Sequence, residues 1–173
     1  MDELKSEFKE KYYALKDWLR NYRELDKEVK NTLKILDQYE ATMTSIGSPV
    51  LSDMPKAKGR IGDRTSEAVV RKMEIEEDLE LAIQERDNRK AEIKGYIRKL
   101  KKADERMVIN LRFIGMYDTY DTTSIMFGDE PDFLAKEESY SRRVLELQKN
   151  ALQNMVSYLD SIGKDPREMK EMI

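Results

Sequence analysis

Apolar side chains recur every three or four residues over the first 46 positions of this chain. They stand at Leu4, Phe8, Tyr12, Leu15, Leu19, Tyr22, Leu25, Val29, Leu33, Leu36, Tyr39, Met43 and Ile46. Twelve steps cover 42 residues, so the mean spacing is 3.5, the period of helices that pack in left-handed coiled coils. No Gly or Pro interrupts residues 2–46. The pattern predicts one long helix that ends at Gly47, a glycine in the usual position after a helix C-terminus.

A second long helix is predicted after a loop. Residues 47–63 hold three of the seven Gly and two of the four Pro, which is typical of a connection rather than a helix. We expect a helix over residues 66–102, capped by Thr65 or Ser66. Its apolar stripe comprises Val69, Met73, Leu79, Ile83, Ile93, Ile97 and Leu100. Residues 84–92 interrupt this stripe with polar side chains.

These two segments predict an all-α fold that begins with a long helical hairpin, an antiparallel coiled coil, over residues 1–103, with its loop near 47–64. The polar stretch at 84–92 leaves part of the hairpin without apolar packing. A second copy of the chain would supply that packing, so a homodimer is expected.

Composition narrows the classes of function. Charged and apolar residues each make up 39% of the 173 residues, a mixture typical of solvent-exposed helices. The absence of Cys and His removes the thiolate nucleophile, the commonest general base and the commonest metal ligands. We therefore expect no enzyme, no metal site and no cofactor. The chain also shows no secretory signal and no apolar run of membrane-spanning length, so we expect a cytoplasmic protein without membrane contact.

The last third of the chain predicts a small domain of shorter helices over residues 104–163. Helices are expected at 104–116, at 118–127 with Asp118 or Asp121 as the cap, and at 140–162. A turn at 128–139 separates the last two, with a short helix beginning at Pro131 as an option. The inward positions of the last helix are Val144, Leu147, Ala151, Leu152, Met155 and Leu159. Gly163 and Pro166 should end it, and the tail at 164–173 should fray.

A short helix, a turn and a helix that begins at Tyr140 are the parts of a helix-turn-helix motif. In that motif the first residues of the second helix enter the major groove of DNA. Arg142 and Arg143 would then contact guanine edges or phosphates, Ser141 would donate to a phosphate, and Tyr140 would pack or stack. The alternative is that two adjacent arginines simply form part of a solvated helix face.

The chain resembles a family of small sigma-like regulators encoded by phages and prophages of Gram-positive bacteria, the late transcriptional regulators of the ArpU and RinA type. The resemblance covers nearly the whole chain. It rests on the long first helix, residues 48–55 (SPVLSDMP), residues 105–127 (ERMVINLRFIGMYDTYDTTSIMF) and residues 140–152 (YSRRVLELQKNAL). It implies DNA binding, transcriptional control and a fold like sigma region 4. Residues 111–113 would then precede the motif, 119–127 would form its first helix, and 141–144 would open its recognition helix.

Charge is distributed unevenly along the chain. Residues 104–173 carry 9 basic and 14 acidic residues, a net charge of −5, whereas residues 86–102 carry eight basic and two acidic residues. Because non-specific affinity for DNA is electrostatic, the acidic region opposes binding and the basic one favours it. Lys90, Lys94, Arg98 and Lys101 form one helical stripe that would contact the DNA backbone; a solvated coiled-coil flank is the alternative reading.

Two functions of different classes follow. In the first, the chain is a phage transcriptional regulator that binds double-stranded DNA at a promoter, contacts RNA polymerase or another regulator, or does both. Arg142 and Arg143 would contact bases or phosphates, and Lys149 and Arg112 would hold the DNA backbone. In the second, the chain binds a host or phage protein without touching DNA. A phage packaging component built from a coiled coil and a helix-turn-helix is a further alternative.

Overall fold

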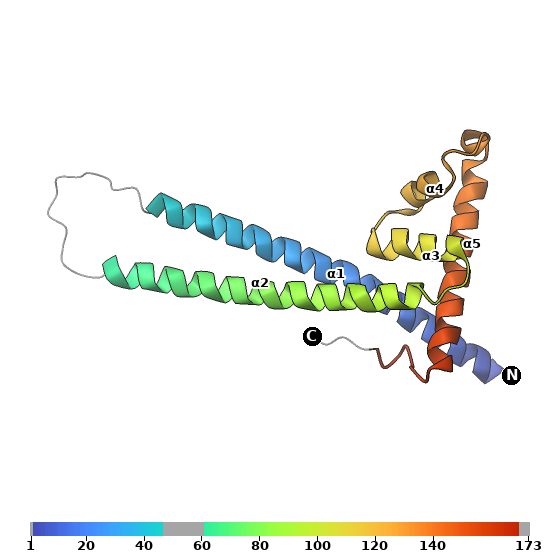
Figure 1. Ribbon diagram of the computed structural model, residues 1–173, viewed down its shortest axis with the longest axis horizontal. Helices are drawn as coiled ribbons and strands as arrows, with labels where there is room; N and C mark the ends of the chain where they lie inside the picture. The colour runs from blue at the N-terminus through green and yellow to red at the C-terminus, as the bar shows by residue number, and fades with distance from the viewer. Residues whose placement is uncertain (1, 47–60, 170–173) are drawn as a thin grey trace. The chain divides into compact units, whose positions relative to one another are not determined.

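The computed structural model describes residues 2–46 and 61–169, with side chains from 5 to 43 and from 66 to 169. Within these ranges it contains helices and no strand, which confirms the predicted all-α class. The elements, in chain order, are α1 (Asp2–Ile46), α2 (Ile61–Ile97), α3 (Ala103–Ile109), the π-helix η1 (Asn110–Ile114), α4 (Thr119–Phe127) and α5 (Phe133–Ser161) (Figure 1).

The bounds of α1 confirm the long helix predicted over residues 2–46. Gly47 and the loop to residue 60 lie outside the described residues. The predicted cap at Thr65 or Ser66 is wrong, because α2 already begins at Ile61. The same helix ends at Ile97, so residues 98–102 form a turn where the sequence predicted helix.

Contacts divide the chain into two compact units. One comprises Met1–Glu24 together with Asn88–Ile173, and the other comprises Leu25–Asp87. This division does not follow the domain boundary predicted at residue 103. The first part of α1 and the last part of α2 instead share one apolar core with the helices that follow, and this larger assembly is called the C-terminal unit below.

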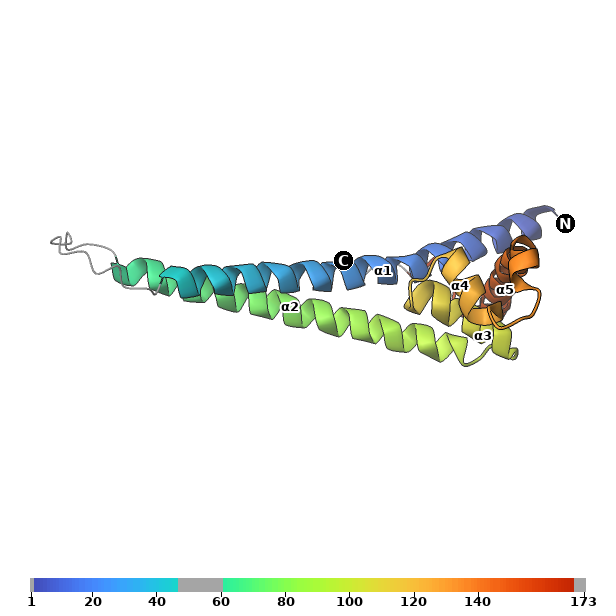
Figure 2. The same cartoon turned by 90° about the horizontal axis from the view of Figure 1, so that it is seen from above.

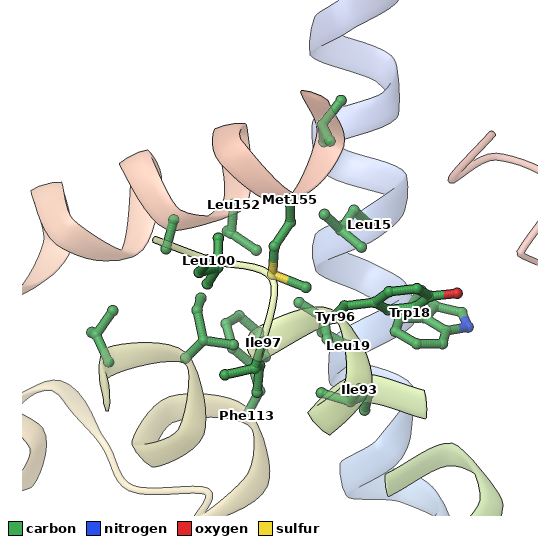
Figure 3. Packing of buried hydrophobic residues seen from close by; sticks show 14 of the residues in the cluster. Leu15, Trp18, Leu19, Ile93, Tyr96, Ile97, Leu100, Phe113, Leu152 and Met155 are labelled. Atoms are coloured by element: carbon green, nitrogen blue, oxygen red, sulfur yellow. The ribbon is translucent and has the colours of Figure 1, made fainter. Parts of the chain in front are cut away.

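The core of the C-terminal unit is built from the heptad positions of α1, the end of α2 and the inward face of α5. Leu15 and Leu19 of α1 are fully buried, as are Ile93 of α2 and Leu152 of α5. Met155 points into the middle of this cluster, as Figure 3 shows. The apolar periodicity of the sequence thus identifies the side chains that assemble this core.

Glu105 is a buried charge that helps to attach α3 to α5. Its side chain is fully buried, and one carboxylate oxygen accepts a hydrogen bond of 2.9 Å from Nδ2 of Asn154. Nζ of Lys102 lies 3.2 Å from the other oxygen, outside hydrogen-bond geometry but close enough to compensate its charge. A buried carboxylate is tolerated when it is paired in this way.

The second unit consists of the remaining parts of α1 and α2, which run antiparallel side by side (Figure 2). The hydroxyl of Tyr39 donates to the carbonyl of Ala68 over 3.1 Å, and Asp26 lies 3.9 Å from the guanidinium of Arg86. The earlier residue of α1 therefore pairs with the later residue of α2, and the later residue of α1 with the earlier one of α2. This antiparallel pairing agrees with the predicted arrangement of the two long segments.

Apolar burial in the second unit is sparse. Within its described residues, Val29 and Leu79 are the buried apolar side chains. Val69 and Met73, which the sequence placed on the inward stripe of α2, are 45% and 62% exposed. The prediction was wrong at these two positions because helical spacing alone does not show where the partner helix lies.

The predicted helix over residues 104–116 consists of two helical forms. The α-helix α3 passes into the π-helix η1, in which the amide of Gly115 donates to the carbonyl of Asn110 over 2.8 Å. Gly115 keeps a right-handed conformation, and Met116 adopts the left-handed one with a φ of 59°. Left-handed backbone is uncommon for a side chain of this size, and π-helical turns often occur at functional positions.

The turn before the last helix is shorter than predicted. Asp118 caps α4 by accepting a hydrogen bond from the amide of Asp121, as its position in the sequence indicates. After α4, the turn covers only residues 128–132, because α5 begins at Phe133 and continues through non-helical angles at Lys136. The predicted turn at 128–139 is therefore too long, and the short helix that the sequence offered as an option begins at Phe133 rather than at Pro131.

The end of α5 follows the predicted stop. Gly163 adopts a φ of 70°, its amide donates to the carbonyl of Asp160, and the amide of Lys164 donates to the carbonyl of Leu159. This is the Schellman arrangement that glycine favours. The next residues are not frayed as predicted, since Pro166 is buried and Arg167 binds the carboxylate of Asp165. Residues 170–173 lie outside the described part of the chain.

Candidate nucleic-acid interface

The two helices of the predicted motif, α4 and α5, are joined by aromatic and hydroxyl contacts. The ring of Tyr140 stacks on that of Phe127 at a centroid distance of 5.1 Å and an interplanar angle of 27°. Oγ of Ser141 lies 3.4 Å from Oγ1 of Thr123. Both α3 and α4 pack against α5 (Figures 1 and 2). Tyr140 and Ser141 therefore hold the two helices together, where the sequence predicted a phosphate contact for Ser141.

A small polar network fixes the first turn of α5. The hydroxyl of Tyr140 donates to Asp132 over 2.7 Å, and Nζ of Lys136 lies 2.6 Å from the same carboxylate. The hydrogen bonds from Lys136 and Tyr140 lower the pKa of Asp132, and the Asp132 carboxylate raises the pKa of both partners. Near neutral pH the carboxylate of Asp132 is therefore ionised, Lys136 is charged and Tyr140 keeps its hydroxyl proton, as the directions of these pKa shifts require. Charge-assisted hydrogen bonds thus stabilise the turn.

Arg142 and Arg143 do not open the helix that carries them. α5 consists of two helical stretches joined by a kink at Lys136, and the two arginines lie in the second turn of the stretch that follows the kink. The prediction that they occupy the first turn was wrong. Arg142 is exposed and forms an ion pair with Glu138, one turn earlier. The guanidinium of Arg143 lies 4.9 Å from the ring centroid of Phe127, a cation–π contact.

Arg112 lies inside the fold rather than on an open surface. Its Nε donates to Oε1 of Gln148 over 3.1 Å, and its Nη1 donates to the carbonyl of Tyr117 over 3.0 Å. Burial lowers the pKa of its guanidinium, and so do the neighbouring charges of Arg20 and Arg23, whereas Asp118 opposes the shift. These bonds join η1 to α5, and the DNA-backbone contact of Arg112 stays a prediction.

Lys149 is exposed on α5, seven residues beyond Arg142. Seven residues are nearly two helical turns, which puts the two side chains on one side of the helix, roughly 10 Å apart along its axis. Lys149 also borders a shallow cavity with Phe8, Tyr12 and Tyr13 of α1. Arg142 and Lys149 thus share a side of α5, and Arg112 does not belong to that group.

The four basic residues that the sequence placed on one helical stripe lie at the end of α2 and in the turn that follows. Because α2 ends at Ile97, Arg98 and Lys101 are not helical, and the prediction of one helical stripe was wrong for these two. Lys94, Arg98 and Lys101 are exposed, and Lys90 is half-buried. Within the described part of the chain, no carboxylate lies at ion-pair distance from these four cations or from Lys99, which the stripe did not include. The guanidinium of Arg106 donates to the carbonyls of Leu100 and Lys101 and so fixes the turn. Below, "the unpaired stripe" means Lys90, Lys94, Arg98, Lys99 and Lys101.

A group of arginines that the sequence did not reveal surrounds a cavity of about 320 Å³ in the C-terminal unit. Arg20 and Arg23 of α1 line it together with Arg112 of η1. Some 90 positions separate the first two from the third, so no local pattern connects them. Only the fold brings these three cations together.

No protein-family model, curated protein or solved structure matches this chain. Among the described residues, no group of three or more acidic side chains has the geometry of a metal site. In the same residues, every helix is too short or too polar to cross a bilayer.

Proposed function

We propose that this chain is a DNA-binding transcriptional regulator of the phage sigma-like class, acting in the cytoplasm of a bacterial host by occupying a promoter or contacting RNA polymerase, without bond chemistry. The observation that carries the proposal is the unpaired stripe. Five cations without a carboxylate partner in the described residues are available to phosphates, and they belong to the same compact unit as α4, the turn and α5.

The stripe is suited to the DNA backbone rather than to bases. Lysine dominates it, and lysine acts as a flexible point charge that follows phosphates without reading sequence. Its position at the C-terminal end of α2 also favours cations through the helix dipole, which stabilises the charges in the free protein. We assign base contacts to Arg142 on the exposed side of α5, with Lys149 on the same side as a further phosphate contact.

The ion pair between Arg142 and Glu138 does not prevent that role. Both side chains are highly exposed, and a surface pair of this kind stabilises by at most about 1 kcal/mol. A phosphate or a guanine edge offers the guanidinium at least as favourable a partner. Arg143 retains its contact with Phe127 and shapes the surface beside Arg142.

Fluorescence anisotropy with a pool of labelled duplexes tests the stripe. The triple variant Lys94→Ala, Arg98→Ala, Lys101→Ala should weaken binding at least about tenfold at low salt, because three phosphate contacts are lost. The matched control removes three cations that are already paired and lie in the second unit, through Lys30→Ala, Lys72→Ala and Arg86→Ala. The control should bind nearly as the parent does, and equal losses in the two triple variants would contradict the proposal.

Glu138→Gln tests the assignment of Arg142. Removal of the carboxylate frees the guanidinium, so affinity for DNA should rise a few-fold. Glu80→Gln on α2 changes the net charge equally and serves as the control, with little change expected. Arg142→Ala should abolish the gain from Glu138→Gln; if the gain persists in the double variant, Arg142 does not contact DNA.

A second candidate function, protein interaction, is favoured by the exposed apolar side chains of the second unit. Leu33, Ile35, Val70 and Leu81 are each between 41% and 59% exposed, and Ile35 and Leu81 border one open groove. Exposed apolar groups gathered on one element are typical of an association surface. We propose that a second copy of this chain covers them, whereas the sequence analysis expected the second copy to pack at residues 84–92.

Sedimentation of the whole chain decides between this candidate and a monomer. The parent should sediment as a dimer at micromolar concentration, and Ile35→Lys with Leu81→Lys should shift it to a monomer without loss of helical circular dichroism. Lys34→Ala and Lys72→Ala, on the same two helices, should leave the dimer intact. A parent chain that stays monomeric at every concentration would rule out self-association.

A further inference from the structure

A cavity in the C-terminal unit is bordered by three arginines. Arg20, Arg23 and Arg112 line it together with the apolar side chains of Leu19, Phe113 and Met116. Its volume of about 320 Å³ lies at the lower end of the range for small-molecule sites. Three cations around one cavity repel each other, and this arrangement is unfavourable unless an anion shares the space.

The described protein groups neutralise these charges only in part. Arg20 lies 3.5 Å from Asp17, but both side chains are more than half exposed. Arg23 forms no ion pair within the part of the chain that the structure describes. The carboxylate of Asp118 is the one acid lining the cavity, and it already accepts the capping hydrogen bond from the amide of Asp121. One carboxylate therefore faces three guanidinium groups.

The fold holds the innermost cation in place. Arg112 is half-buried, and its bonds to Gln148 and to the carbonyl of Tyr117 use Nε and Nη1. Its other terminal nitrogen, Nη2, donates no hydrogen bond to the residues described. The π-helix η1 and the left-handed backbone of Met116 reverse the direction of the chain beside the cavity. A preorganised guanidinium of this kind loses little entropy when an anion binds.

We propose that this cavity binds the terminal phosphate of a small phosphate monoester. A monoester carries a charge between −1.5 and −2 at neutral pH and about three acceptor oxygens, which suits three guanidinium groups. Because it has a single substituent, its phosphate can enter a concave site with the organic group directed outward. A phosphodiester of a duplex carries a sugar on each side, so its phosphate would have to approach the half-buried Arg112 with two bulky substituents. The apolar walls provide contacts for the organic group.

Isothermal titration with phenyl phosphate tests the proposal on the whole chain, with methyl phenyl phosphate as the diester that keeps the same ring. Phenyl phosphate should bind at least about tenfold more tightly than methyl phenyl phosphate, because the diester has one charge and two free oxygens. Arg23→Gln should weaken binding about tenfold and Arg23→Lys should restore part of it. Arg71→Gln, an exposed arginine of α2 outside the cavity, should leave binding unchanged.

Three outcomes would overturn the assignment: no heat of binding up to about 10 mM phenyl phosphate, equal binding of the diester, or unchanged binding in Arg23→Gln. Since Arg23 has no described ion pair, its replacement should not unfold the chain, and a thermal melt of the variant checks this. The site does not depend on the proposed DNA contacts, so a chain that fails to bind DNA would still be expected to bind phenyl phosphate.

Discussion

Nε of Arg112 donates a hydrogen bond to Oε1 of Gln148, which lies 36 positions further along the chain. Gln148 is one of the few buried polar side chains of α5, and the bond joins this helix to η1. A buried N–H donor without a hydrogen-bond partner lowers the stability of the fold, because its hydrogen bond to water is lost and not replaced. The pair therefore stabilises the junction beside the arginine-lined cavity.

Gln148→Leu should lower the free energy of unfolding by about 1–3 kcal/mol, because it leaves Nε of Arg112 without an acceptor. Urea denaturation followed by circular dichroism measures the change. Gln153→Leu, on the same helix and half-buried, serves as the control with an expected effect below about 0.5 kcal/mol. Similar losses in both variants would show that the bond to Arg112 contributes little.

Gly128 ends α4, and its replacement by Ala should destabilise the fold. A Cβ at this position would overlap the carbonyl oxygen of Ser124, which accepts the hydrogen bond of the Gly128 amide. We expect a loss of about 1–3 kcal/mol, as for other overpacked sites, together with a lower melting temperature. The change tests whether the short turn to α5 has the geometry described.

Gly95 provides the opposite case. It lies inside α2, and nothing stands within 4 Å of a Cβ built there. Gly95→Ala should therefore stabilise the chain by about 0.5–1 kcal/mol, since alanine loses less backbone entropy in a helix. Destabilisation by Gly95→Ala would indicate that the end of α2 is packed more closely than the structure shows.

The segment after α5 should show its order in an NMR titration of carboxyl carbons. The guanidinium of Arg167 lowers the pKa of Asp165 to about 2. In Arg167→Gln the pKa of Asp165 should return toward its ordinary value of 3.8. An unperturbed pKa in the parent chain would mean that the segment frays as the sequence first suggested.

The same pair sets a pH dependence. Because the pKa of Asp165 is lowered in the folded chain, its contribution to stability is complete above the unfolded pKa and is lost as pH falls through the folded one. The stabilising effect of Arg167, measured as the difference in melting temperature between parent and Arg167→Gln, should shrink between about pH 4 and pH 2. A difference independent of pH in this window would contradict the pairing.

The sequence predicted most of the helices because they depend on local signals. The heptad spacing extends without interruption to Ile46, Asp118 is a good cap, and Gly163 supplies a left-handed residue. Each of these features acts within a few residues, so a single sequence shows it. Leu15 and Leu19 likewise follow from periodicity and are buried as expected.

The early start of α5 could not be predicted in the same way. Residues 128–132 contain Gly, Pro and acids, which favour a turn, and nothing nearby marks Phe133 as a helix start. The ring of Phe133 is buried in the apolar core and lies 6.0 Å from that of Tyr140, so packing that no local pattern shows stabilises a helical turn with weak propensity. This turn and the kink at Lys136 place Arg142 and Arg143 further from the start of α5 than predicted.

The candidate site, too, could be predicted from the sequence only in part. The stripe of Lys94, Arg98 and Lys101 is visible in the sequence, but its lack of ion pairs depends on where the carboxylates of other helices lie. The role of Arg112 depends on Gln148 and on the carbonyl of Tyr117, which a helical pattern cannot reveal. The arginine-lined cavity needs α1 to meet η1, a contact between distant parts of the chain.

Salt dependence of DNA binding tests the central claim, that the unpaired stripe contacts phosphates, most directly. Affinity of the parent chain for a labelled duplex pool is measured by anisotropy over a range of salt concentrations. The five contacts of the unpaired stripe and that of Lys149, at about 0.9 counterion each, predict a plot of log affinity against log salt with a slope of about −5. A slope near zero, or no binding at the lowest salt, would contradict the account.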